Sequence, residues 1–155
     1  MMKPEHRPSQ EYLRNAVLTS SPEQLQLMLY DGALRFANEG LSAIQAQDRD
    51  AAFRALERAQ LIVLELSNGT RREVNPEIAD RMLSLYNFVW RRLVDANIYQ
   101  DEQALREALR VLQHQRESWV LLLEKLRREL AGAAPHDPGP PESGSERVSS
   151  FVAEA

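Results

Sequence analysis

Four helix-start signals divide the first 130 residues of this chain, and they constrain its fold more than any other feature. In each signal, a residue that can cap a helix N-terminus precedes a run with apolar residues at helical spacing. Proline follows two of these caps and fits the first helical position. Gln24 also completes a capping box with the first cap. The four caps are Ser21, Asp48, Asn75 and Asp101.

These caps predict helices over about residues 22–47, 49–67, 76–97 and 102–130, with Asn68 and Gly69 ending the second. The joints at residue 48 and at residues 98–101 are short, and short joints between long helices make neighbours antiparallel. No useful length of chain alternates with the period of two that a strand needs. We therefore expect an all-α fold, an antiparallel four-helix bundle formed by residues 18–131.

The two ends of the chain are expected to lie outside the bundle. Residues 1–17 form an N-terminal extension. Residues 132–147 hold four of the eight prolines and three of the six glycines, and they cannot bury enough apolar surface to offset the chain entropy. We therefore expect residues 132–155 to be a disordered tail. Near its end, Val148, Phe151 and Val152 have helical spacing, so one weak helical turn is the alternative to a frayed end.

Composition excludes several functional classes. The 155 residues suggest one domain, 43% of them are hydrophobic, and the net charge of −4 argues against a nucleic-acid binder. No Cys is available for a disulfide or a thiolate metal site, and His6, His114 and His136 stand far apart. The sequence contains no catalytic motif and no phosphate-binding glycine loop. We expect no enzyme activity, no metal and no cofactor.

The lengths of the apolar runs in the sequence indicate where in the cell the protein is expected. The start "MMKPEHRPSQ" lacks the apolar run of a signal peptide. The longest apolar runs, such as "WVLLL" at residues 119–123, are far too short to span a bilayer. We expect a soluble, cytoplasmic protein without membrane insertion.

The helix expected over residues 22–47 carries two apolar stripes, although packing against one core needs only one. At about 100° per residue, the first stripe contains Leu25, Met28, Leu29, Gly32 and Phe36. Nearly opposite lie Leu27, Tyr30 and Leu34. The later helices also carry surplus apolar residues, and a large exposed apolar patch typically marks an interaction site. Alternatively, thick helices and a fifth segment absorb the surplus, or the chain is a helical scaffold or homodimer that buries it at an interface.

Three stretches of the sequence resemble one known family. "TSSPEQLQLMLYDGALRF" at residues 19–36 is similar to the first helix of the flagellin-specific secretion chaperones, the FliS family. "LSLYNFVWRRLVDANIYQD" at residues 83–101 resembles the third helix of that family, and "LRVLQHQRESWVLLL" has the Trp of its fourth. Together the resemblance covers about residues 12–130, with two long motifs in the family's order.

The resemblance implies a function as well as a fold. Members of this family are cytoplasmic antiparallel bundles that bind the disordered C-terminal segment of flagellin, prevent its premature polymerisation and deliver it to the export gate of the flagellar type III apparatus. This is helix-in-groove recognition and needs no cofactor. In such members the N-terminal segment can fold over the empty groove, and Tyr12 occupies the matching position. We expect a monomer or a weak homodimer.

Nine residues are candidates for the flagellin-binding groove. Leu27 and Leu34 follow from the outer heptad of the first long helix, and Leu61 and Leu64 from the apolar run "LIVLEL" in the second. In the third helix, its second apolar stripe and the family match together select Tyr86, Trp90, Leu93, Val94 and Asn97. For each of the nine, the alternative is a place in the bundle core.

Overall fold

The computed structural model describes residues 9–132, with the side chains of Ala16 and Val17 left out. Within that range the chain forms five helices and no strand: α1 (Gln10–Thr19), α2 (Pro22–Gln45), α3 (Arg49–Asn68), α4 (Pro76–Tyr99) and α5 (Glu102–Gly132). The four long helices correspond to the four that the sequence predicts. The expected tail, with Val148, Phe151 and Val152, lies outside the described residues apart from Gly132, which ends α5.

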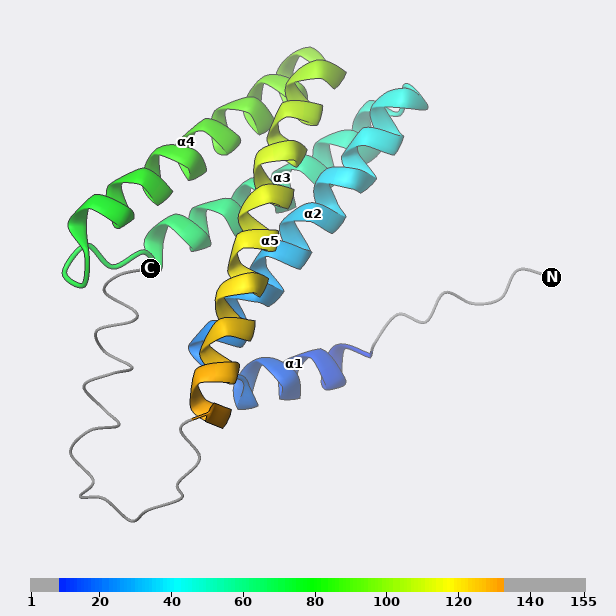
Figure 1. Cartoon of the computed structure of the whole chain (residues 1–155). Helices are drawn as coiled ribbons and strands as arrows, with labels where there is room; N and C mark the ends of the chain where they lie inside the picture. Colours follow the sequence, from blue (N-terminus) through cyan, green and yellow to red (C-terminus); the bar gives the residue numbers. More distant parts are fainter. Residues whose placement is uncertain (1–8, 133–155) are drawn as a thin grey trace.

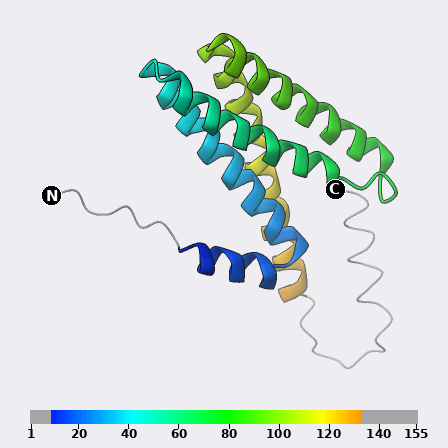
Figure 2. The same cartoon turned by 180° about the vertical axis from the view of Figure 1, so that it is seen from behind.

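The four long helices form a closed ring. α2 packs against α3 and α5, and α4 packs against the same two helices, so α2 and α4 lie diagonally across the bundle (Figures 1 and 2). Consecutive helices reverse direction at each joint, which confirms the expected antiparallel bundle. None of the described helices is long and apolar enough to cross a membrane.

All four predicted helix caps are present. The Ser21 hydroxyl accepts from the Gln24 backbone N–H, while the Gln24 side chain accepts from the Ser21 N–H. The side chains of Asp48, Asn75 and Asp101 each accept from the backbone N–H three residues later. These bonds satisfy N–H groups that a helix start leaves without an intrahelical partner, and so fix where each long helix begins.

The helix ends are less regular than the starts. Gln47 and Gln100 have positive φ angles of 57° and 51°, the left-handed conformation that favours Gly or Asn. Gln100 takes this conformation directly after α4 and donates its N–H to the carbonyl of Ala96. α4 therefore reaches Tyr99, two residues beyond the predicted end. Because this conformation favours Gly or Asn, a glutamine at these positions does not allow the sequence to predict it.

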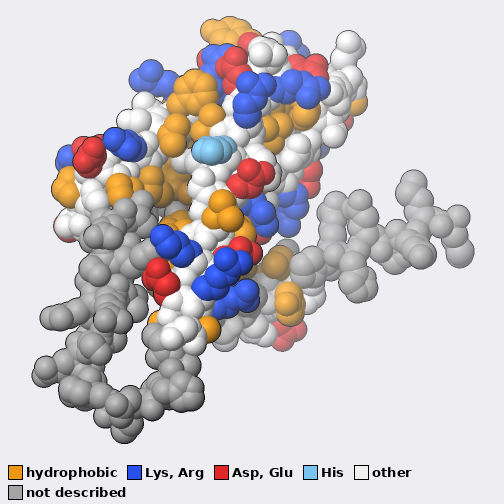
Figure 3. Space-filling view, viewed as in Figure 1, with side chains coloured by type: hydrophobic (Ala, Val, Ile, Leu, Met, Phe, Trp, Pro, Cys, Tyr) orange, Lys and Arg blue, Asp and Glu red, His pale blue; other side chains and the backbone are white. Residues whose placement is uncertain are grey.

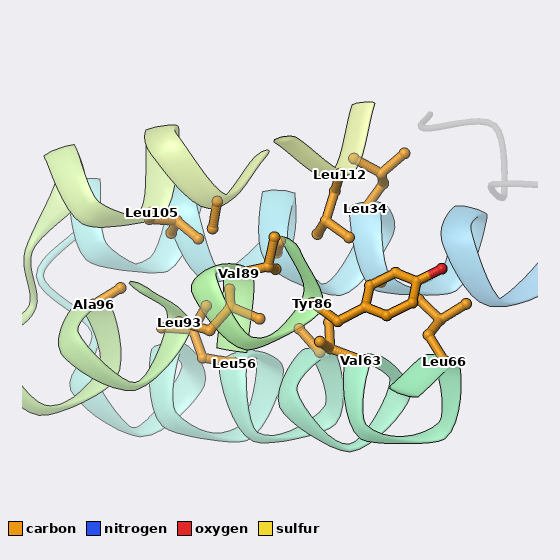
Figure 4. Packing of buried hydrophobic residues seen from close by; sticks show 14 of the residues in the cluster. Leu34, Leu56, Val63, Leu66, Tyr86, Val89, Leu93, Ala96, Leu105 and Leu112 are labelled. Atoms are coloured by element: carbon orange, nitrogen blue, oxygen red, sulfur yellow. The ribbon is translucent and has the colours of Figure 1, made fainter. Parts of the chain in front are cut away.

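Side chains from all four long helices fill the core (Figure 4). Tyr30, Leu34 and Ala37 belong to it, so the second stripe of α2 faces inward. The first stripe faces α3, since a Cβ on Gly32 would lie 3.1 Å from Ile62 Cδ1. A helix in a closed ring has two neighbours, and α2 therefore uses both stripes for packing. The expectation that a bundle helix needs only one stripe is wrong for α2.

α2 and α3 approach closely at Gly40. A Cβ at this position would lie 2.6 Å from Leu56 Cδ2 and 2.8 Å from Leu56 Cγ. Leu56 is fully buried, so its side chain has no free space into which to turn. Gly40 thus sets the separation of the two helices, at the cost of weaker helix propensity.

We expect Gly40→Ala to destabilise the bundle by about 1 kcal/mol, because overpacking a core costs roughly 1–3 kcal/mol and alanine returns roughly 1 kcal/mol of helix propensity. Urea unfolding measures the change. Gly132→Ala is the control, since a Cβ there meets no atom within 4 Å. Shortening the opposing side chain with Leu56→Val should reduce the cost of Gly40→Ala. A stabilised Gly40→Ala variant would contradict the close packing.

A buried pair of tyrosines links the diagonal helices α2 and α4. The hydroxyls of Tyr30 and Tyr86 lie 2.5 Å apart, within hydrogen-bonding distance, and the ring centres are 6.4 Å apart. Gln26 Nε2 also donates to the Tyr30 hydroxyl over 3.4 Å. Burial raises the pKa of both tyrosines above the usual range, and for Tyr86 the neighbouring Tyr30 raises the pKa further. Both hydroxyls therefore stay protonated in the folded state.

These raised pKa values make the fold sensitive to alkaline pH. Unfolded tyrosines lose protons above about pH 10 while Tyr30 and Tyr86 keep theirs, so the free energy of unfolding should fall as pH rises past that value. Tyr86→Phe should lose about 1–2 kcal/mol at pH 7, because the Tyr30 hydroxyl loses its short bond, and should show a shallower alkaline decline. Denaturant melts from pH 7 to 11 measure both effects. Tyr99→Phe, at an exposed position, should change neither.

Candidate functional site

A strip of side chains along α3 and α4 forms the candidate binding surface. Asn97 Nδ2 on α4 donates to Gln60 Oε1 on α3 over 3.2 Å, which marks where the surface edges of the two helices meet. Leu64 lies one helical turn after Gln60, and Phe53 two turns before it. On α4, Trp90 and Val94 lie two turns and one turn before Asn97. We call these six residues, together with the adjacent Leu61, the α3–α4 surface.

This surface is strongly apolar and open to solvent. Phe53, Leu61, Leu64 and Trp90 are large hydrophobic side chains that remain exposed, with 48% exposure for Leu64 and 39% for Trp90. Val94 is half-buried beside them. Single exposed apolar residues are ordinary, but several on adjoining helix faces are typical of a binding site.

One polar atom of this surface lacks a hydrogen-bond partner. Asn97 uses its amide nitrogen to bind Gln60, while its Oδ1 atom is buried and accepts no hydrogen bond within the described part of the chain. A buried acceptor without a partner costs roughly 1–3 kcal/mol. Such a cost is typical of a position kept for a reason other than stability.

Six of the nine candidate residues are exposed or half-buried. Leu61, Leu64 and Trp90 are exposed, and Val94, Asn97 and Leu27 are half-buried. The structure brings five of them together on the α3–α4 surface. Leu27 is on α2, which lies diagonally across the bundle from α4. The described surface therefore does not contain all nine residues in a single site.

The other three candidates, Leu34, Tyr86 and Leu93, belong to the core cluster. Leu34 is 9% exposed and lies beside Leu112 of α5, while Tyr86 and Leu93 are fully buried (Figure 4). We expected these three side chains at the surface, and the structure instead buries them in the core. The heptad that selected Leu34 is the contact of α2 with the core and α5, because α5 closes the ring. A part for these residues in ligand binding stays a prediction.

Tyr12, the expected groove cover, is on α1. It is 65% exposed. From its junction with the start of α2, α1 points away from the bundle (Figures 1 and 2). Tyr12 lies in the first turn of that helix, where its backbone N–H donates to the Ser9 hydroxyl. In this arrangement Tyr12 covers none of the α3–α4 surface, and its role as a cover stays a prediction.

Sequence reasoning missed Phe53 as a site residue. It lies three turns before Leu64 on the same face of α3, and a helical projection of the whole segment would have grouped the two. The choice of Leu61 and Leu64 rested on the short run "LIVLEL" alone. On the face formed by α4 and α5, Leu85, Phe88 and Leu121 are also exposed, but charged side chains of both signs separate the hydrophobic groups there (Figure 3).

The described residues offer a binding surface without catalytic groups. Among residues 9–132, no group of three His, Cys, Asp or Glu side chains is placed to hold a metal ion. The raised pKa values belong to Tyr30 and Tyr86, which are enclosed in the core. The exposed side chains of the α3–α4 surface are chiefly apolar.

Comparison with known proteins identifies the family. Residues 5–126 match the family described as "Flagellar protein FliS". The chain belongs to the FliS family. This membership confirms the sequence resemblance. Because FliS chaperones are not enzymes, it also confirms the expectation that the chain is not one.

Curated FliS relatives match over most of their length. The flagellar secretion chaperone FliS of Bacillus subtilis is 32% identical over 126 residues, covering 81% of this chain and 93% of that protein. FliS of Salmonella typhimurium is 34% identical over 118 residues, covering 76% and 87%. FliS of Campylobacter jejuni is 31% identical over 108 residues, covering 70% and 84%. The family match of this FliS member includes α1 to α4 and most of α5.

A matched pair of substitutions distinguishes the core from the surface in this FliS protein. Leu34→Glu should cost several kcal/mol, about 3 or more, because it places an unpaired carboxylate in the core. Leu64→Glu should change stability by only about 0.5 kcal/mol, since water reaches the new charge. Thermal melts at one pH compare the two variants. A melt of Leu34→Glu like that of the unaltered chain would instead place Leu34 on the surface.

Proposed function

We propose that this FliS family member is a cytoplasmic chaperone that binds the C-terminal segment of flagellin on the α3–α4 surface. One observation carries the proposal: large apolar side chains stay exposed along two adjoining helices of a bundle whose core is already filled. The curated relatives named flagellar secretion chaperones support the partner class.

Burial of apolar area is the physical basis of the binding. Each large apolar side chain that leaves water contributes about 1.5–3 kcal/mol. Phe53, Leu64 and Trp90 are spread over several turns, as an amphipathic ligand helix requires of its partner surface. The ligand is disordered when free, so about 2–5 kcal/mol or more of the contact energy goes into ordering it. Binding is then firm enough to hold the segment and still reversible.

The polar groups of the α3–α4 surface position the ligand helix more than they increase its affinity. Asn97 Oδ1 can accept a hydrogen bond from the ligand once local side chains shift, and this would remove the cost of an unpaired acceptor. The bond between Asn97 and Gln60 keeps the two helix edges together. A ligand helix lying along this line contacts α3 and α4 at the same time.

The bound segment is protected from self-association because its apolar heptads face the chaperone. Delivery to the export gate of the flagellar type III apparatus then requires only that the gate bind the complex and compete for the segment. Such transfer works by differential binding and needs no nucleotide or metal. The proposal therefore places the protein between flagellin synthesis and export.

We expect Leu64→Glu to weaken binding of the flagellin C-terminal segment at least tenfold, about 1.4 kcal/mol, because the complex would desolvate the new carboxylate. Isothermal titration with a peptide of that segment from the same organism measures the affinity. Leu121→Glu introduces the same change at an exposed leucine of α5 and should leave affinity unchanged. Equal affinities for both variants would remove the α3–α4 surface from the site.

A homodimer is the alternative use of the same surface. Sedimentation of the free protein separates the two functions. A monomer that binds flagellin supports the chaperone, whereas a stable dimer that Leu64→Glu dissociates and that ignores flagellin supports the scaffold.

A further inference from the structure

A second surface lies on the other side of α3, between α2 and α3. A hollow of about 230 Å³ opens there, lined by Glu39, Ala51, Arg54, Ala55 and Arg58. A water molecule occupies about 30 Å³ of liquid, so the hollow admits a side chain of several carbon atoms. The short side chains of Ala51 and Ala55 leave this space, and the contact at Gly40 brings its two walls close together.

Two arginines line this hollow, and a third, Arg35, shares the Phe36 ring with one of them. The guanidinium carbons of Arg35 and Arg58 lie 4.8 Å and 5.5 Å from the centre of the Phe36 ring, so both cations stack on one aromatic side chain. Arg54 and Arg58 line the hollow itself. None of the three forms an ion pair with another residue between 9 and 132. Glu39 offsets only part of their positive charge.

The positive charge defines the ligand that fits. A carboxylate can pair with Arg54 or Arg58 in the two-pronged geometry that guanidinium groups favour. The alanine methyl groups favour an apolar side chain between the carboxylates. The best ligand is therefore a short segment with an aromatic or aliphatic residue flanked by acidic ones.

The chain itself contains such a segment after α5. Residues 133–155 carry four Asp or Glu and a single Arg, and they end in "SERVSSFVAEA". In that stretch Phe151 stands between Glu146 and Glu154. The sign of the charge and the type of apolar residue both complement the surface between α2 and α3.

We propose that residues 146–154 bind the hollow between α2 and α3, with Phe151 over the alanines and the flanking carboxylates on Arg54 and Arg58. α5 passes the start of α2, since Trp119 Nε1 donates to the carbonyl of Glu23 over 2.9 Å. Gly132 lies about 20 Å beyond Trp119 along α5, and the hollow lies about 20–24 Å from Glu23 along α2 in the opposite direction, so about 36–44 Å separates them. The chain from Gly132 to Phe151 can extend to about 63 Å, so Phe151 can reach the hollow.

Tethering makes a weak contact sufficient. The linker is long enough to span this distance but shorter than it on average, so the effective concentration lies below the millimolar maximum and a sub-millimolar intrinsic affinity keeps the hollow occupied much of the time. The α3–α4 surface lies on the other edge of α3 and stays open. The proposal is independent of flagellin binding, and the assay below contains no flagellin.

Disulfide trapping tests this contact, because the natural chain has no cysteine. Ala51→Cys combined with Ser150→Cys places one thiol in the hollow and one beside Phe151. Gln103→Cys with Ser150→Cys is the matched control, since Gln103 is exposed on α5 about 44 Å from Gly132, a similar axial distance on another helix. In dilute full-length protein at low salt, the first pair should form an intrachain disulfide at least tenfold faster than the control.

Two changes should remove that advantage. Raising NaCl to about 1 M shortens the screening length to about 3 Å, so both pairs should then react at similar rates. Arg54→Gln with Arg58→Gln should do the same at low salt, and a thermal melt shows whether that variant is folded. The salt series needs no arginine substitution and remains decisive if the variant unfolds. Equal rates at low salt, an advantage that survives high salt, or disulfide-linked dimers would each overturn the proposal.

Discussion

The hydrogen bond between Tyr30 and Tyr86 connects one of the two pairs of helices that lie diagonally in the bundle. α2 and α4 lie diagonally, and their hydroxyls meet in the core at 2.5 Å. A buried hydroxyl without a partner is costly, so the Tyr86 hydroxyl requires Tyr30 at this depth, while Tyr30 also accepts from Gln26. This requirement restricts how α2 and α4 can slide along their axes. α3 and α5 then occupy the two remaining sides of the ring.

The ring leaves α3 with two chemically different edges. Towards α4, Leu64 is exposed, with Phe53 three turns before it on the same helix face, and Trp90 is exposed on α4, so the edge suits an apolar partner. Towards α2, Gly40 permits close contact, and Arg54 and Arg58 surround a small hollow. One helix can therefore serve two ligands of opposite character without either blocking the other. This separation depends on the ring order and not on any single residue.

Membership of the FliS family supports a binding role for the exposed apolar residues, but it does not identify which of them bind. Packing answers part of that question. The second stripe of α2 is used up by the core and α5, which removes Leu34 from the available surface. The surplus that remains for a partner lies chiefly on α3 and α4. A surface on two adjoining helices suits a helical ligand better than scattered leucines around the bundle would.

The sequence by itself determined the local structure of this protein. Ser21, Asp48, Asn75 and Asp101 start the four long helices because capping depends only on residues within one turn. Their antiparallel order also followed, since short joints permit little else. Tertiary structure alone decided which apolar stripe each helix buries. Leu34 and Leu64 look equivalent in sequence, and only the closure of α5 onto α2 buries the first and leaves the second in water. Burial depends on residues that are distant in the chain. Helical periodicity identifies an apolar face of a helix, but it does not identify what packs against that face.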